Sequence, residues 1–361
     1  MNRRQLILGA AAAAVAARGL AAPTPAVTTP RAAAVLKSTL VVNGLDGSAP
    51  TEEYLGMLKT AGVGCIHHSV AGIANFARAL AFLDRNPGGI VAAGTVAEIR
   101  AAAASGRVAY IPGWQSADYL IADAGGKPAV ENLGAYKKLG LRICSIAYNN
   151  PNLFGGGCLT PDVGLTADGR KLIEQIHKLN LVLDVGGHTN EKTSFDALAM
   201  SSGVPIICSH TNARAITDNA RNATDKLMEA IARTGGVVGI TAVSDFHSRA
   251  AKDAAIPRSP QASFAQHLDQ YDYMKKLIGI DHIAMGPDFM YGRVDLNRMY
   301  REIWPAHVYS DMPWDMVKGF GTIVELPNVV EGLLARGWTP AELRKLLGEN
   351  WLRVYGQVWG G

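Results

Sequence analysis

Two histidines follow short apolar segments in the middle of the chain, and their spacing could bring them to one site. His188 comes after the segment 181–185 and two glycines, and His210 comes after the segment 204–208. The residues between them, 191–200, have a helical pattern. If both segments are parallel strands, their carboxyl ends lie on the face where such folds carry their active sites. Two imidazoles there can share one metal ion, so we interpret His188 and His210 as candidate metal ligands, with two unrelated strand-end residues as the alternative.

Apolar strand-like segments alternate with helical segments along most of the chain. Short segments rich in β-branched residues are predicted strands, at 39–42, 63–67, 108–111, 142–147, 181–185, 205–208, 236–241 and 282–285. Helical patterns alternate with them, at 52–60, 73–84, 96–104, 129–138, 171–179, 191–200, 223–234 and 264–278. Eight strand–helix units predict an α/β fold, a (β/α)8 TIM-type barrel. Two helices at 324–335 and 340–354, after an irregular aromatic-rich segment at 291–320, predict a C-terminal helical extension.

The size and composition of the chain fit one large domain. It has 361 residues, of which 48% are hydrophobic and 18% are charged, which is ordinary globular composition. Barrels of this length are commonly single domains, so we expect residues 37–361 to form one barrel domain. The formal net charge is +4 and no basic stripe is present. This charge pattern argues against nucleic acid as a partner.

The N-terminus has the design of an export signal. Arg3 and Arg4 precede an apolar run, 6–17, and small residues stand at Ala21 and Ala22. The run is too short to span a bilayer stably. The paired arginines predict a twin-arginine-type (Tat) signal peptide at 1–22, with an ordinary secretory signal as the alternative. We therefore expect a Pro/Thr/Ala linker at 23–36, export to the periplasm, and a mature chain without a transmembrane segment.

Several short motifs stand in a characteristic order between about residues 40 and 355. They are Gly164-Leu165-Thr166 with Gly169, His188, Ser209-His210, Asn219-Ala220-Arg221-Asn222 with Asp225, Gly279-Ile280-Asp281-His282, and Gly286-Pro287-Asp288-Phe289. With these motifs the chain resembles the membrane dipeptidase (renal dipeptidase) family of the amidohydrolase superfamily. The resemblance implies a barrel fold, a dipeptide or similar small substrate, and a homodimer.

The resemblance also implies roles for single residues. Asp288 stands where the superfamily has a carboxylate that takes a proton from the attacking water, and partial burial would raise its pKa toward the working range. Arg221 matches an arginine that holds the substrate carboxylate, a task that suits a guanidinium. Tyr148 replaces a histidine that contacts the reacting carbonyl oxygen, and a phenol can still donate to an oxyanion. The alternatives are a surface ion pair of Arg221 with Asp225 and simple packing of Tyr148.

The chain departs from the family pattern at the metal ligands. Leu45 and Gly47 stand where the family has His-x-Asp, and Gln115 stands where it has a bridging glutamate. An uncharged amide cannot bridge two cations as a carboxylate does. A binuclear site is therefore not expected, and Gln115, with Asn149 after the fourth predicted strand, is interpreted as a substrate contact.

Three further polar residues lie at strand ends near this face. Asp46 is adjacent to the altered positions, and we expect it to serve a turn, because successive strand side chains point to opposite faces. A metal-ligand role is the alternative, and it requires a backbone kink that the neighbouring glycines make possible. His67 and His68 follow the second predicted strand. Either could replace a lost ligand, but a core-edge or surface position is the preferred interpretation.

The sequence is compatible with two functions. The first is a metal-dependent hydrolase of a dipeptide or other small amide with a free carboxylate, holding one divalent ion, with zinc as the first choice. Two imidazoles are a small ligand set for catalytic zinc, so Asp288 or Gln115 would have to complete it. The second is a divergent or metal-free protein that binds, or runs another reaction on, a small carboxylated metabolite.

Overall fold

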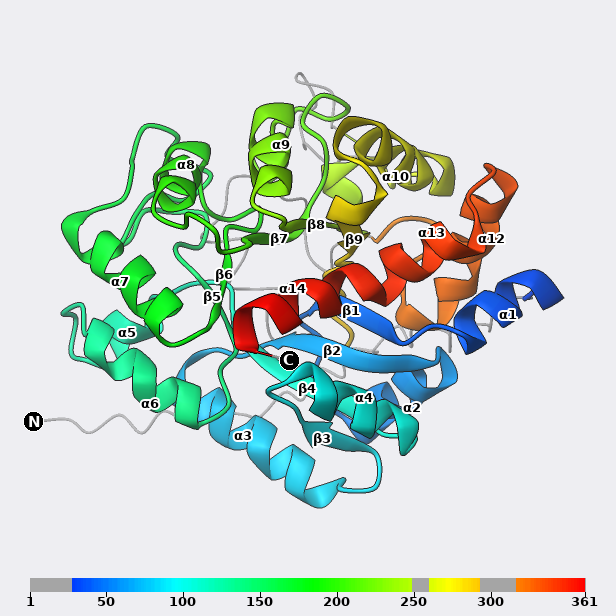
Figure 1. Cartoon of the computed structure of the whole chain (residues 1–361), viewed down its shortest axis with the longest axis horizontal. Coiled ribbons are helices and arrows are strands. Elements are labelled where there is room, and N and C mark those ends of the chain that lie inside the picture. Colours follow the sequence, from blue (N-terminus) through cyan, green and yellow to red (C-terminus); the bar gives the residue numbers. More distant parts are fainter. Residues whose placement is uncertain (1–27, 249–259, 293–315, 361) are drawn as a thin grey trace, which may run out of the picture.

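The computed structural model describes residues 28–248, 260–292 and 316–360. Within them, eight parallel strands form a nearly closed barrel with helices around it (Figure 1), which confirms the predicted (β/α)8 class. In order around the barrel these strands are β1 (Val41–Asp46), β2 (Val63–Ser69), β4 (Val108–Trp114), β5 (Ile143–Ser145), β6 (Val182–Asp184), β7 (Ile207–Thr211), β8 (Val237–Ile240) and β9 (Ile283–Met285).

The first and last strands meet beyond their regular ends. Asp46 and Phe289 form a parallel bridge. The Asp288 N–H donates to the Leu45 carbonyl at 3.1 Å, and the Gly47 N–H donates to the Phe289 carbonyl at 2.8 Å. The barrel is therefore joined between β1 and β9 at its carboxyl end, beside Asp288.

Helices cover the outside of the barrel. They are α1 (Pro30–Lys37), α2 (Glu52–Thr60), α3 (Gly72–Arg85), α4 (Val96–Ala104), α5 (Tyr119–Ala122), α6 (Leu133–Lys138), α7 (Ala167–Lys178), α8 (Glu191–Ala199), α9 (Asp225–Arg233), α10 (Phe264–Ile278), α12 (Leu326–Ala335), α13 (Pro340–Arg344) and α14 (Asn350–Trp359). Most of the longer ones begin at a Ser, Thr or Asn whose side chain accepts a hydrogen bond from the first turn, as Asn190 does for α8 and Thr224 for α9. Such caps satisfy backbone N–H groups that the helix itself leaves without partners.

The C-terminal extension closes one end of the barrel, where α14 lies across the strands (Figure 1). Trp351 of α14 packs among residues from the amino-terminal parts of the strands, such as Val42, Ile143 and Val237. Its indole donates to the Met285 carbonyl at 3.0 Å. This apolar end leaves the opposite, carboxyl end of the barrel for polar side chains.

Some predicted boundaries need correction. The short strand β3 (Ile90–Ala92) was not expected; it pairs with β4 outside the barrel path. The predicted helix at 340–354 is divided by a π-helical turn, Lys345–Glu349. The end of the expected linker is helix α1, because Thr29 caps it and Ala32 and Val35 are buried.

Other predictions fall wholly or largely outside the described residues. They are the signal peptide at 1–22 and most of the aromatic-rich segment at 291–320. Among the residues that the structure describes, no helix is both long enough and apolar enough to cross a membrane.

Candidate functional site

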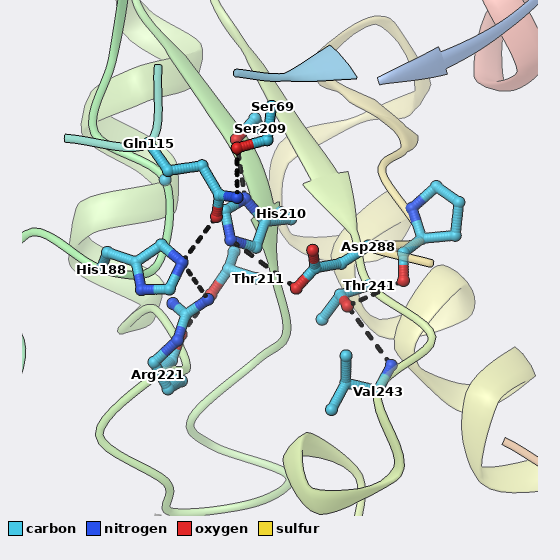
Figure 2. A network of polar contacts seen from close by, with 12 residues as sticks. Ser69, Gln115, His188, Ser209, His210, Thr211, Arg221, Thr241, Val243 and Asp288 are labelled. Carbon is cyan, nitrogen blue, oxygen red and sulfur yellow. Dashed lines mark hydrogen bonds and ion pairs between the residues drawn. The ribbon is translucent and has the colours of Figure 1, made fainter. Parts of the chain in front are cut away.

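The predicted site residues come together at the carboxyl end of the barrel (Figure 2). His188 follows β6, His210 lies in β7, and Asp288 follows β9, while Arg221 comes from the segment between β7 and α9. Gln115 follows β4. The exposed fractions of His188, His210, Arg221 and Asp288 are 2%, 1%, 1% and 5%, so these four ionisable groups are almost fully withdrawn from water.

His188 is the residue that most of the other candidates contact. Its Nδ1 lies 2.7 Å from Asn149 Oδ1, and its Nε2 lies 2.8 Å from Gln115 Oε1 and 3.1 Å from Arg221 Nη2. The Tyr148 ring stacks on the imidazole with centroids 3.7 Å apart. Burial first, and then the charge of Arg221, hold the pKa of His188 well below its usual range. His188 is therefore neutral and held on several sides.

His210 presents a different environment. Its Nδ1 lies 2.7 Å from Ser209 Oγ, and its Nε2 lies 3.9 Å from Asp288 Oδ2. Within the described residues, no group hydrogen-bonds this buried Nε2. Burial, with smaller effects of Arg221 and His67, also lowers the pKa of His210 well below its usual range. Two groups able to accept a proton thus face each other across a short gap.

Asp288 has the properties of an acid–base group near neutral pH. Burial raises its pKa to about 7, against the opposing effect of Arg221 and with a smaller contribution from Asp46. Its backbone is in the left-handed region, with φ 61°, a conformation that Asp and Asn tolerate better than most residues. A carboxyl group of this kind exchanges protons in the pH range where enzymes work.

Arg221 is a buried residue, so the alternative of a surface ion pair with Asp225 is wrong. The Asp225 carboxylate instead accepts from Tyr273 at 2.6 Å. The Arg221 guanidinium lies over the Phe246 ring at 5.0 Å, and its backbone N–H donates to Asn219 Oδ1 at 2.9 Å. These contacts hold Arg221 with its guanidinium pointing toward His188.

Gly187 makes room for this cation. It has φ +40°, and a Cβ atom there would overlap Arg221 Nη1 and lie 2.7 Å from the His210 carbonyl oxygen. The close approach of Arg221 to His188 therefore depends on the absence of a side chain at position 187.

Replacing Gly187 by alanine is expected to lower the free energy of unfolding by more than about 1 kcal/mol, because both the backbone conformation and the space are unsuited to a side chain. Urea denaturation would measure the change. Gly203→Ala is the matched control, because Gly203 has φ +77° but open space around it. Equal losses for the two variants would mean that the overlap with Arg221 costs nothing.

The three remaining strand-end residues have structural positions. Asp46 accepts from the Ser48 N–H at 2.8 Å and from Tyr54 of α2, so the turn role expected for it is confirmed. His68 lies between Tyr110 Oη at 2.7 Å and the Ser48 carbonyl at 2.8 Å. With these partners, neither Asp46 nor His68 takes the place of the metal ligands that the family has at positions 45, 47 and 115.

His67 lies inside the barrel, where its Nδ1 donates to the Gly44 carbonyl at 2.7 Å. Burial lowers its pKa to about 4. It is fully buried rather than at the surface.

Asp184 and Ser209 were missed by sequence reasoning as site residues. Asp184 ends β6, and its carboxylate accepts from Ser209 Oγ at 2.6 Å. The available signal was a carboxylate at the end of an apolar strand, followed by the glycine pair that precedes His188.

The fold and this group of side chains define an amidohydrolase-like barrel with a cluster of buried ionisable groups at its carboxyl end. Residues 73–298 match the sequence profile of the family described as Membrane dipeptidase (Peptidase family M19), more than half of the chain. The chain belongs to the membrane dipeptidase family.

Two individual relatives match about two thirds of the chain. The chain is 32% identical over 236 residues to the "Uncharacterized protein in pqqA 5'region" of Klebsiella pneumoniae, covering 63% of this chain and 76% of the relative. It is 24% identical over 229 residues to the dipeptidase tcpJ of Claviceps purpurea (strain 20.1), covering 63% of this chain. The match spans 47%, about half, of that dipeptidase.

Solved structures show the same architecture. An amidohydrolase from Pseudomonas aeruginosa superposes with a TM-score of 0.80 and 25% identity, covering 91% of this chain and 99% of that chain. A metallopeptidase from Rhodobacter sphaeroides, liganded with a phosphinate mimic of the dipeptide L-Ala-D-Ala, superposes with a TM-score of 0.72 and 22% identity, covering 89% and 100%. The second likeness supports the fold alone.

The side chains as arranged do not fit the metal ion that metallopeptidase relatives imply. No group of three or more His, Cys, Asp or Glu side chains suited to a metal occurs in the described part of the chain. His188 Nε2 faces a guanidinium at 3.1 Å, which would repel a cation at that nitrogen. His210 and Asp288 remain as potential ligands, fewer than the three protein ligands typical of catalytic zinc. The predicted metal on His188 and His210 therefore requires Arg221 to move.

Proposed function

We propose that this protein is an acid–base hydrolase of a dipeptide or another small amide with a free carboxylate, with Asp288 as its base. The observation that carries the proposal is the buried Asp288 carboxyl, with a pKa of about 7, located 3.9 Å from His210 Nε2. Above that pH the carboxylate can take a proton from a water molecule that attacks the amide carbonyl. Membership of the membrane dipeptidase family supports the reaction class.

Substrate recognition in this proposal rests on Arg221. Its buried guanidinium suits a carboxylate, which it can hold with two parallel charge-assisted hydrogen bonds. Membership of the membrane dipeptidase family supports a substrate of dipeptide size. Tyr148 is proposed as the donor to the carbonyl oxygen, and Gln115 and Asn149 as polar groups that hold His188 and the substrate.

The experiment is hydrolysis of a panel of dipeptides and N-acyl amino acids by the purified protein, followed by release of free amine, with and without added zinc. We expect turnover of at least one carboxylate-bearing amide, and a turnover that is lower by about 10²–10⁴-fold in Asp288→Asn. Turnover of none of them by the wild-type protein under either condition would overturn the hydrolase assignment.

A second candidate is a metal-free protein that binds, or runs another reaction on, a small carboxylated metabolite. The specific observation in its favour is Arg221, which meets His188 where a metal ion would otherwise bind. Elemental analysis of the purified protein separates the cases. One equivalent of zinc, removed in His210→Ala, would support a hydrolase with a mononuclear metal site and exclude the metal-free protein. Absence of zinc together with absence of turnover would support the second candidate, and two equivalents of zinc would contradict both.

A further inference from the structure

Asp184 is a fully buried carboxylate that the proposed reaction does not use. Its Oδ1 accepts from the Gly186 N–H at 2.7 Å and from the Ser209 N–H at 2.9 Å, and its Oδ2 lies 2.6 Å from Ser209 Oγ. Burial raises its pKa to about 6, while the hydrogen bonds from Ser209 and Gly186 oppose that rise. At pH 8 the group is therefore an ionised acceptor with three donors.

The Ser209 hydroxyl connects Asp184 to His210. Ser209 Oγ lies 2.7 Å from His210 Nδ1 on its other side. A hydroxyl has one hydrogen, and an ionised carboxylate can only accept. Because Ser209 gives its hydrogen to Asp184, its oxygen must accept from His210, so Nδ1 carries the imidazole hydrogen.

The state of the other ring nitrogen follows from this. A neutral imidazole has one N–H, so a hydrogen on Nδ1 leaves a lone pair on Nε2. That nitrogen is buried 3.9 Å from Asp288 Oδ2, without a hydrogen-bond partner in the part of the chain that the structure describes. A water molecule or a ligand with a donor group can join the two acceptors.

We propose that Asp184 is a positioning residue that acts through Ser209 to fix His210 as the Nδ1–H tautomer, which keeps Nε2 as an acceptor that faces Asp288. Without the hydrogen bonds from His210 to Ser209 and from Ser209 to Asp184, the His210 imidazole could carry its hydrogen on Nε2 and donate it to Asp288. That hydrogen bond would close the gap between His210 and Asp288. The inference rests on the proposed function only in taking Asp288, which His210 faces, as the proposed base. The tautomer itself can be observed without substrate.

The test is NMR spectroscopy of the full chain with ¹⁵N-labelled histidine at pH 8, with the His210 signals assigned from their loss in His210→Gln. In the wild-type protein we expect a protonated Nδ1 and an unprotonated Nε2. In Asp184→Asn we expect the reverse, because an amide nitrogen can donate to Ser209 Oγ and turn the serine hydrogen toward His210. In Ser209→Ala the preference for Nδ1–H should be reduced.

The NMR experiment has two controls, one internal signal and one additional variant. His67 is an internal reference, because its Nδ1 donates to the Gly44 carbonyl and should stay protonated in every variant. Ser145→Ala is the matched variant; Ser145 donates to the Asp184 backbone carbonyl at 2.8 Å and not to the carboxylate. It should leave His210 unchanged.

A protonated Nε2 in the wild-type protein would overturn the proposal, as would an unchanged His210 tautomer in both Asp184→Asn and Ser209→Ala. Ser209→Ala decides the matter if Asp184→Asn does not fold. Because the readout is a ring nitrogen signal and not turnover, a protein that hydrolyses no dipeptide can still show the expected tautomer. Failure of the proposed function and failure of this inference are thus separate results.

Discussion

Replacing Asp288 by asparagine is expected to lower kcat by about 10²–10⁴-fold, the range typical for loss of a positioned general base. Asparagine matches aspartate in size and tolerates the left-handed backbone at this position, where φ is 61°. The loss would therefore report the missing carboxylate and not a distorted loop. Steady-state kinetics on any amide that the wild-type protein hydrolyses would measure it, and a variant with more than about a tenth of wild-type kcat would exclude Asp288 as the base.

The pH dependence follows from the same carboxyl group. Its pKa of about 7 means that the base is protonated and inactive below that pH and ionised above it. We expect kcat/KM of the wild-type protein to rise with pH through about 7. The residual activity of Asp288→Asn should lack this rise, and an identical profile in both proteins would assign the titration to another group.

Stability should change in the opposite direction to activity. The pKa of Asp288 is raised from 3.8 to about 7 in the folded protein. Between these values the unfolded chain releases the proton while the folded protein keeps it, so the contribution of this group to stability falls as pH rises from about 4 to about 7 and stays low above that. Asp288→Asn is therefore expected to have a higher Tm than the wild-type protein at pH 8, with a smaller difference at pH 4.

Asp281→Asn provides a control with the opposite sign. The hydrogen bond from Lys345 lowers the pKa of Asp281, so its ionised form is the stabilising one. Its replacement should reduce the Tm at pH 8, and only slightly, because the pair is at the surface. A lower Tm for Asp288→Asn at pH 8 would show that burial of the ionised Asp288 carboxylate carries no cost.

The second large effect is expected from Arg221→Lys. A lysine cannot reproduce the paired hydrogen bonds of a guanidinium, so binding of a carboxylate ligand should weaken by about 1.5–3 kcal/mol, which is roughly 10–150-fold in Kd. The amide form of the same ligand should be affected much less. Calorimetric titration with the acid and the amide on both proteins would measure the difference.

Arg214→Lys is the matched control for this experiment. Arg214 lies in the same segment before α9, and its Nη2 donates to the Ala220 carbonyl at 3.1 Å. Its replacement should leave the discrimination between acid and amide unchanged. If Arg221→Lys weakens both forms of the ligand equally, Arg221 is a scaffold residue and does not hold the carboxylate.

The sequence was sufficient to predict the barrel and the face that carries the site. Alternating apolar strands and amphipathic helices have strong periodic signals. His188 and Asp288 follow such strands, and His210 lies near the end of one. The sequence did not predict a contact that depends on loop geometry. The position of Arg221 beside His188 requires the conformation of Gly187, and no periodic pattern encodes it.

Local rules also explain the other differences. The short strand β3 has three residues, too few for a distinct alternation. The helix α1 lies in a segment whose prolines indicated a linker, but Pro30 occupies the first turn, where proline is compatible with a helix. The link from Asp184 through Ser209 to His210 joins two strands, so only the pairing of those strands brings it together.

The bridge between Asp46 and Phe289 makes the proposed activity depend on complete folding of the barrel. Asp288 is held by the Leu45 carbonyl, 243 positions earlier in the chain, and this contact forms only when the last strand docks beside the first. Contacts at such separation form late and slowly during folding. The proposed base is therefore not held in place in a partly folded chain with an open barrel. We expect turnover after dilution from denaturant to recover only as fast as the barrel closes.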